Sequence, residues 1–403
     1  MTGPITDSII VGGGLAGPAL ALALAQEGLS VTLIDARPER ASEHFDGRAY
    51  ALALASRRLL ANIGVWAHVA NHAQPILAIK VADGRPGEAP SSLHLAFDHA
   101  EIEEGPMGHM VEDRFLRAAL DDAIETEPRI AVLRGQPVVA QETGPTSATV
   151  TLADGGRVEG RLLIGADGRG SGTAQRARIG RSVKSYGQTA VTCALAHEKP
   201  HRGTAFQLFL PNGPLAILPL PGNRSSIVWS ERDERAKALM GMDDEAFLAA
   251  LRPVFGSFLG EIALEGSRFA YPLSLSLARS FTAPRVALVG DAAHGIHPLA
   301  GQGLNAGLRD VAALAEVLSE AHSRGEDPGS DPVLERYARW RRFDTAGLAF
   351  TTDSLNRLFS NDSRVLRFTR DVGLGLVNRI PPLRRAFIRE AAGLTGELPK
   401  LMR

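Results

Sequence analysis

Ser8-Ile9-Ile10-Val11-Gly12-Gly13-Gly14-Leu15-Ala16-Gly17 is the stretch of sequence that decides the fold. Its apolar start indicates a strand, and the alanine- and leucine-rich run from Pro18 to Glu27 has helical character. A second apolar run, Val31 to Ile34, leads into Asp35. Strand, glycine turn, helix and strand in quick succession form a βαβ unit, which predicts a parallel sheet.

The three glycines of this turn have separate tasks in a nucleotide-binding unit. Gly12 would make the tight bend, Gly14 would let the backbone approach a pyrophosphate, and Gly17 would let helix and strand pack closely. The helix N-terminus then faces the anion. Asp35, at the end of the second strand, can accept a hydrogen bond from a ribose hydroxyl. We therefore expect a dinucleotide site rather than a glycine-rich surface turn.

Two later segments also place a glycine and an aspartate after an apolar strand. Gly165-Ala166-Asp167-Gly168 follows Leu162 to Ile164, and Gly290-Asp291 follows Val286 to Val289. The carboxylate of the second segment can accept hydrogen bonds from a polyol; the alternative is that it only caps the next turn. Backbone amides of Gly301 to Asn305, at the start of a helix, would suit a bound group on which negative charge develops.

These segments together resemble the three signatures of the class A flavin-dependent aromatic hydroxylases. A second set of segments resembles, more narrowly, the polyprenylphenol hydroxylases of ubiquinone biosynthesis. That set comprises Asp46-Gly47-Arg48-Ala49-Tyr50-Ala51-Leu52, Tyr186-Gly187-Gln188, Gly213 to Leu220, Tyr271-Pro272-Leu273 and His297 to Asn305. The resemblance covers essentially the whole chain. It implies an FAD monooxygenase that uses NADH or NADPH and O2 to hydroxylate a polyprenylated phenol through a flavin C4a-hydroperoxide.

The resemblance also implies a cofactor site. Gly12, Gly14 and Gly17 would hold the FAD pyrophosphate, and Asp35 the adenosine ribose. The other implied FAD contacts are Arg48, Arg114, Val138, Asp167, Asp291, Gly301, Gly303, Leu304 and Asn305. No catalytic residue is identified. The candidates around the flavin loop are Pro298, Tyr271 and His297, and for the tyrosine and the histidine a structural role is the alternative.

One position departs from the family pattern. The Asp-Gly motif of the family is usually followed by Ser-x-x-Arg, which would place an arginine at position 174. The residue there is Ala174, and the nearest arginine along the chain is Arg176. If that guanidinium helps to dock the nicotinamide donor, either the docking step differs here or Arg176 substitutes for it.

The expected fold class is α/β. A Rossmann-like FAD-binding domain of the glutathione-reductase type would carry an inserted, mostly antiparallel β-sheet substrate domain and a helical C-terminal tail. Residues 1–186 would form the FAD-binding domain with some embedded substrate-domain strands, and 187–282 the substrate-binding sheet. Residues 283–332 would return to the FAD-binding domain, and 333–403 would be helical, with a break at Pro381-Pro382. Helices are also predicted over Ala51 to Gly64 and Glu112 to Ile124.

Composition excludes several classes of protein. A hydrophobic content of 44%, a charged content of 22% and a net charge of -1 are ordinary for a globular enzyme and give no sign of a nucleic-acid partner. Cys193 is the single cysteine, so we expect neither a disulfide nor a metal site. No apolar run is long enough to span a membrane, and the glycine turn begins too early for a cleavable leader. The expected location is cytoplasmic.

The C-terminal region is basic. From Asp331 to Arg403 it has 14 Lys+Arg against 8 Asp+Glu, a net charge of +6. The rest of the chain therefore has a net charge of -7. Three interpretations stay open: helices packed on the catalytic body, a peripheral contact with a membrane surface, or docking to a ubiquinone-biosynthesis complex. A polyprenyl substrate lives in the bilayer, so either of the last two would serve it.

Two rival functions remain at this point. An aromatic hydroxylase acting on a small soluble phenol would need a tight polar pocket, whereas the mostly apolar sequence from Leu208 to Leu220 favours a prenylated substrate. A flavin-bearing scaffold that organises a biosynthetic complex without turnover would show no flavin reduction by NADH or NADPH. The intact flavin signatures favour a working enzyme.

Overall fold

The computed structural model describes residues 5–40, 45–84, 95–295, 302–342, 344, 347 and 380–403. Three predicted site residues, Pro298, His297 and Gly301, lie outside these ranges. The middle of the predicted tail, from 348 to 379, also lies outside them.

The first sheet is built on parallel strands, as the βαβ pattern predicts. Its order is β17-β18-β11-β1-β2-β8, and the neighbours from β18 to β8 pair in parallel. The strands are β1 (Thr6–Val11), β2 (Val31–Asp35), β8 (Ile130–Arg134), β11 (Arg157–Gly165), β17 (Thr282–Ala283) and β18 (Val286–Leu288). Antiparallel β9 (Val138–Thr143) and β10 (Ala148–Leu152) extend from β11. This is the Rossmann-like half of the expected α/β fold.

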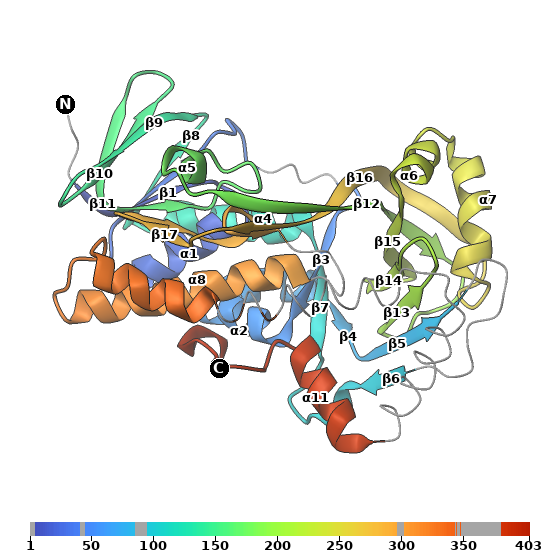
Figure 1. The fold of residues 1–403 in the computed structure, drawn as a ribbon. Coiled ribbons are helices and arrows are strands. Elements are labelled where there is room, and N and C mark those ends of the chain that lie inside the picture. The colour runs from blue at the N-terminus through green and yellow to red at the C-terminus, as the bar shows by residue number, and fades with distance from the viewer. Residues whose placement is uncertain are drawn as a thin grey trace.

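Helices α1 (Ala16–Gln26) and α8 (Gln302–Ser323) lie together against this sheet (Figure 1). Small alanines alternate with leucines in α1, and every residue from Gly17 to Ala25 is buried. The absence of bulky polar side chains lets α1 lie between the sheet and α8. Helix α4 (Asp113–Thr126) also packs on α1, and short α5 (Gly172–Arg176) follows β11.

The second sheet has the order β19-β16-β12-β15-β14-β13-β5-β6 and is antiparallel except between β13 and β5. Two 17-residue strands, β12 and β16, run from the first sheet into this second body (Figure 1). The strands are β5 (Ala78–Asp83), β6 (Leu95–Asp98), β12 (Arg181–His197), β13 (Thr204–Phe209), β14 (Leu215–Leu220), β15 (Arg224–Arg232), β16 (Ile262–Ala278) and β19 (His294–Gly295). Helices α6 (Asp233–Met240) and α7 (Asp244–Phe255) enclose a separate core around Trp229 and Phe247.

A small third sheet, β3-β7-β4, stands between the two bodies. It consists of β3 (Ala49–Ala53), β7 (Gly108–Glu112) and β4 (Gln74–Ile76). The predicted helix over Ala51 to Gly64 is therefore wrong at its start. Ala51 pairs with Met110 and Ala53 with Gly108, and this non-local pairing overrides the local helical preference. Helices α2 (Leu54–Asn62) and α3 (Trp66–Val69) and the turns η1 (Ala70–His72) and η2 (His99–Glu101) complete this region.

The C-terminal region packs back on the first body. Residues 331–342 are helical, and Tyr337 and Arg341 of this helix are fully buried. Helix α11 (Pro381–Ala391) begins at the prolines that were predicted to break a helix, because proline is tolerated in the first helical turn. The final turn, η5 (Lys400–Met402), lies against α2, where Asn62 donates a hydrogen bond to the carbonyl of Leu401. Within the described ranges, no helix is long and apolar enough to cross a membrane.

Candidate functional site

The three glycine-containing motifs meet where β1, β11 and β18 end. The amide of Ala166 donates to the carbonyl of Val11 at 2.8 Å, and the amide of Val289 donates to the carbonyl of Gly165 at 3.0 Å. The carboxyl ends of parallel strands are the usual ligand-binding edge of such a sheet. The sequence predicts each motif separately, and the fold assembles them at that edge.

Close packing explains two glycines of the first motif. Gly12 has a φ of +120°, and a Cβ at this position would collide with the Ala166 carbonyl. A Cβ on Gly17 would collide with the carbonyl of Gly12. Gly14 is different, because a Cβ there would meet no protein atom within 4 Å. The backbone at the start of α1 is therefore open to an approaching group.

Asp35 lies at the end of β2 and is only 5% exposed. Its carboxylate pairs with Arg37 at 2.9 Å, and Arg37 also donates to the carbonyl of Gly13. The carbonyl of Asp35 accepts from Gln136 at 3.1 Å, which brings the start of β9, with partly buried Val138, to the same edge. The structure therefore groups Asp35 and Val138 near the glycine turn.

Asp167 turns its carboxylate toward α5. It accepts hydrogen bonds from Ser171 and from both the amide and the hydroxyl of Thr173, the last two at 2.9 Å. Ala174, where the family usually has arginine, is 5% exposed. Arg176 donates to Gln141 at 3.2 Å instead; burial lowers the pKa of its guanidinium, and nearby Asp167 raises it in part.

Asp291 lies in the turn η3 (Gly290–Ala292), with a carboxylate that is 43% exposed. Arg169, which directly follows the Asp167-Gly168 motif, donates to it at 3.1 Å. Arg181, at the start of β12, donates to the carbonyls of Asp291 and Ala292. Sequence reasoning missed both arginines; for Arg169, its position beside the motif is the signal that could have identified it.

Tyr271 lies on β16 near this turn. Burial raises the pKa of its hydroxyl, and the nearby Arg169 guanidinium lowers it in part. The structure thus brings Tyr271, Arg169 and Asp291 into one neighbourhood. The other two catalytic candidates, Pro298 and His297, lie outside the described residues.

The start of α8 is fastened to β3 and α2 through one side chain. Asn305 Oδ1 accepts from the Ala53 amide at 2.8 Å and from Ser56 Oγ at 2.7 Å, and its Nδ2 donates to the carbonyl of Ala51 at 2.8 Å. The side chain of Asn305 is thus engaged within the protein. Leu304 packs against the main core, whereas a Cβ on Gly303 would meet nothing within 4 Å.

The two predicted arginines both lie beside carboxylates. Arg48 pairs with Asp46 at 2.6 Å and with Asp113 at 3.4 Å. Arg114 pairs at 2.8 Å with Glu112, whose side chain is only 1% exposed. Glu112 also pairs at 2.8 Å with Arg224, which comes from β15 of the second sheet. This cluster joins the two bodies and was not predicted from the sequence.

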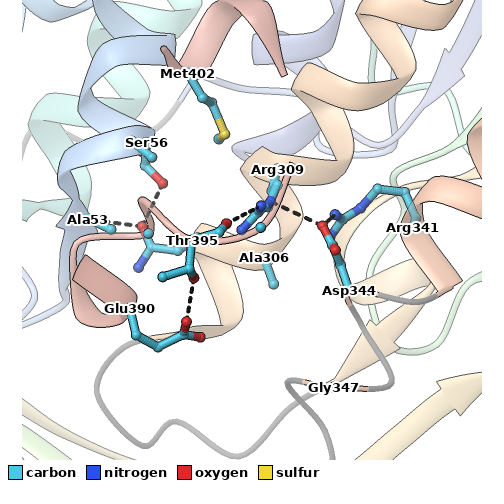
Figure 2. A pocket seen from close by; sticks show the side chains of 14 residues that line it. Ala53, Ser56, Ala306, Arg309, Arg341, Asp344, Gly347, Glu390, Thr395 and Met402 are labelled. Atoms are coloured by element: carbon cyan, nitrogen blue, oxygen red, sulfur yellow. Dashed lines mark hydrogen bonds and ion pairs between the residues drawn. The ribbon is translucent and has the colours of Figure 1, made fainter. Parts of the chain in front are cut away.

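A cavity of about 450 Å³ lies between α2, α8 and the C-terminal region (Figure 2). Figure 2 shows that its charged side chains have partners: Arg309 is ion-paired with Asp344, and Glu390 accepts a hydrogen bond from the hydroxyl of Thr395. The cavity is also lined by Ala53, Ala55, Ser56, Asn305, Ala306, Arg341, Gly347, Gly393, Gly396 and Met402. Among the described residues, no group of three or more histidine, cysteine, aspartate or glutamate side chains could hold a metal ion.

Residues 5–346 match the family model described as an FAD binding domain. The protein belongs to the FAD-binding-domain family. FAD fits the arrangement of this family member, because open space at Gly14 and Gly303 borders the edge where the three motifs meet. The prediction of an FAD-dependent class A flavoprotein fold is thereby confirmed.

Curated relatives of this FAD-binding-domain protein share nearly its full length. It is 46% identical to the ubiquinone hydroxylase UbiL of Rhodospirillum rubrum, over 100% of this chain and 95% of that protein. It is 37% identical to the 3-demethoxyubiquinol 3-hydroxylase of Escherichia coli, over 98% and 100% of the two chains. The human mitochondrial ubiquinone biosynthesis monooxygenase COQ6 is 33% identical, over 97% and 93%.

Solved structures agree on the fold. The crystal structure of p-nitrophenol 4-monooxygenase PnpA from Pseudomonas putida matches with a TM-score of 0.80 and 17% identity, over 98% of this chain and 99% of that chain. The monooxygenase PieE in complex with FAD and substrate matches with a TM-score of 0.72 and 20% identity, over 98% and 72%.

Proposed function

We propose that this protein is an FAD-dependent monooxygenase that hydroxylates a polyprenylated phenol of ubiquinone biosynthesis, using NADH or NADPH and O2. The observation that carries the proposal is the meeting of Gly12, Asp167 and Asp291 motifs at one edge of the parallel sheet. Relatives named as ubiquinone hydroxylases, similar over nearly the whole chain, support the substrate class.

In this proposal the FAD pyrophosphate lies over Gly14 and the N-terminus of α1, where backbone amides favour an anion. Asp35 accepts from the adenosine ribose, beside Val138, after Arg37 has moved aside. Asp291 accepts a hydrogen bond from a hydroxyl of the ribityl chain, which takes the place of the bond from Arg169. Arg48 and Arg114 contribute positive charge toward the phosphates, while Gly303 and the backbone amides of Leu304 and Asn305 face the flavin edge.

Bound FAD supplies the redox chemistry, and the chain positions the phenol ring and excludes water. Leu218 of β14 supports a prenylated substrate, because it packs toward the main core and is only partly buried. Phe206 and Leu208 of β13 lie on the other face of the sheet, against the core under α6 and α7.

The test compares quinone precursors, by mass spectrometry, in cells lacking this gene and in the parent strain. A polyprenylphenol that lacks one ring oxygen should accumulate, and the wild-type gene should restore ubiquinone while an Asp291→Ala gene does not. Unchanged ubiquinone without an accumulated precursor would point to a small soluble phenol instead. Purified protein whose flavin is not reduced by NADH or NADPH, even with the phenol present, would indicate the scaffold.

We also propose that α11 touches the membrane in which such a substrate resides. Ile380, Leu383 and Phe387 share one helix face and are 38%, 39% and 45% exposed. Arg384 lies beside this stripe, one turn from Ile380 and from Phe387, and is paired with Glu101 at 2.7 Å, while Ile388 is buried against the protein. An exposed apolar stripe beside arginines suits an anionic lipid surface.

Co-sedimentation with phosphatidylglycerol-containing vesicles tests this contact. The double variant Leu383→Glu/Phe387→Glu should bind the vesicles at least fivefold less than the wild type. Val139→Glu is the matched control, because Val139 is also exposed, at 57%, but lies on β9. Equal binding by all three proteins would eliminate α11 as the membrane contact and favour a protein partner.

A further inference from the structure

One fully buried carboxylate holds the turn that carries Asp291. Asp310 lies in α8 and is 0% exposed. Its Oδ2 accepts from the amide of Gly290 at 2.8 Å and from Nε2 of His294 at 2.6 Å. Asp291 is therefore flanked on both sides by residues attached to Asp310.

The backbone around this carboxylate is also closely packed. Gly290 has a φ of +61°, and a Cβ on Gly307 of α8 would lie 3.1 Å from the Gly290 Cα. The turn can approach α8 this closely because both positions are glycine. The helix therefore sets where the turn lies, and Asp310 supplies the hydrogen bonds that fix it there.

A second buried group connects this carboxylate to the C-terminal region. Arg341, 2% exposed, donates from Nε to Asp310 Oδ1 at 2.7 Å and pairs with Asp344 at 2.6 Å. In the same helix, the hydroxyl of Tyr337 donates to the carbonyl of Leu288 at 2.7 Å, at the end of β18. Helix 331–342 therefore supports both the strand and the turn that follows it.

The charges of this cluster compensate one another. Asp310 faces Arg341, and Asp344 faces both Arg341 and Arg309. Burial acts to raise the pKa of the Asp310 carboxyl, but His294 and Arg341 lower it below its usual range. Asp310 is thus ionised at neutral pH, and neutralising it would leave the Arg341 guanidinium buried without its main partner, which is costly.

We propose that Asp310 is a positioning residue of the FAD site, which fixes Asp291 for the cofactor and couples it to helix 331–342 through Arg341. The inference rests on the proposed placement of FAD against Asp291. Asp310 itself touches no cofactor in this scheme and acts only through the turn. FAD binding must then stabilise helix 331–342 by the same free energy by which the ordered helix strengthens FAD binding.

The main test is FAD binding by Asp310→Asn, which keeps the shape of the side chain and removes its charge. We expect the Kd for FAD to rise at least tenfold, equivalent to about 1.4 kcal/mol. The midpoint potential of the FAD that does bind should become more positive, because buried negative charge has been removed. Arg341→Lys keeps the positive charge but loses the planar fork, so it should show a smaller change in the same direction.

Arg285→Gln is the matched control. Arg285 is 5% exposed and ion-paired with Asp327, but it fastens the loops at Gly144, Pro145 and Arg161, away from the three motifs. It should lower the melting temperature of the apoprotein while leaving the Kd and the potential of FAD within error. If Asp310→Asn binds FAD like the wild type, or if Arg285→Gln weakens it equally, Asp310 has only a structural role.

Hydrogen exchange measures the coupling in the wild-type protein and covers the case in which Asp310→Asn does not fold. Adding FAD should slow amide exchange in helix 331–342, and Arg341→Lys should reduce that protection. Unchanged exchange in this helix when FAD binds would overturn the coupling. A wild-type protein that binds no FAD would instead overturn the proposed function, so the two failures are distinguishable.

Discussion

Arg169 Nε donates to Asp291 Oδ2 at 3.1 Å, although the two residues are 122 positions apart in the sequence. The bond joins the loop after β11 to the turn after β18. Both side chains are partly exposed, at 42% and 43%. Exposed ion pairs contribute about 0–1 kcal/mol, so this pair can open at little cost when a ligand replaces Arg169.

Replacing each partner in turn should therefore have unequal effects. Asp291→Asn is expected to raise the Kd for FAD about tenfold, the usual cost of about 1.4 kcal/mol for a lost charge-assisted hydrogen bond. Arg169→Gln should change it less than threefold and alter the melting temperature by less than about 2 °C. Fluorescence titration with FAD and thermal denaturation measure both quantities. Equal weakening by the two substitutions would mean that Arg169 itself contacts the cofactor.

Substitutions at two glycines of the first motif should distinguish an effect on stability from an effect on FAD binding. Gly12→Ala should destabilise the apoprotein by about 2 kcal/mol or more, because the new Cβ collides with the Ala166 carbonyl and φ is positive. Gly14→Ala should leave the melting temperature of the apoprotein unchanged within about 1 °C, because no protein atom lies within 4 Å of its Cβ.

Binding should nevertheless fail in Gly14→Ala. Its methyl group would occupy the space through which the proposed pyrophosphate approaches the backbone, and we expect at least a tenfold loss of FAD affinity. The comparison needs only a denaturation curve and an FAD titration for each variant. Normal FAD affinity in a stable Gly14→Ala protein would place the pyrophosphate elsewhere.

His109 should make the protein sensitive to acid. Burial and nearby Arg57 lower the pKa of His109 from 6.5 to about 4. The unfolded chain therefore binds a proton below pH 6.5 that the folded chain takes up only near pH 4. The contribution of His109 to the free energy of unfolding is present above pH 6.5 and is lost as the pH falls through this window, by about 3.4 kcal/mol at most (2.5 × 1.36).

The free energy of unfolding at pH 7.5 and at pH 5 tests this effect. The decrease on acidification should be smaller in His109→Gln, whatever the stability of the variant at pH 7.5. His197→Gln is a useful comparison, because burial also lowers the pKa of His197, but its ring is hydrogen-bonded to Ser225 and to the carbonyl of Lys199. An identical acid response in wild type and His109→Gln would contradict the assignment.

Local and non-local interactions explain which features the sequence predicts. The unit from β1 to Asp35 is predicted correctly because its strands, helix and glycines are set by neighbours in the chain. The segment from Ala51 to Ala53 is wrongly predicted as helix, because the strand that it pairs with, β7, begins only at Gly108 and is not visible to a local sequence pattern. The Asp310–Arg341 pair joins two helices, and neither residue stands in a recognisable motif. The candidate site is therefore predicted as separate motifs, whereas the groups that hold them together emerge only in the fold.

Tyr271 is the one of the three catalytic candidates that lies among the described residues. Burial raises the pKa of its hydroxyl above the ordinary value, with partial opposition from Arg169. At neutral pH it is therefore protonated, and it can donate a hydrogen bond but cannot accept a proton. Tyr271→Phe should leave every apparent pKa between pH 6 and 9 in the kcat profile unchanged, even if it raises KM by removing a hydrogen bond. The measurement is the rate of hydroxylated product formation against pH for both proteins. Loss of a limb of the profile in Tyr271→Phe would show that the tyrosine is ionised in the working enzyme, which would require a cation closer to its oxygen than Arg169 provides here.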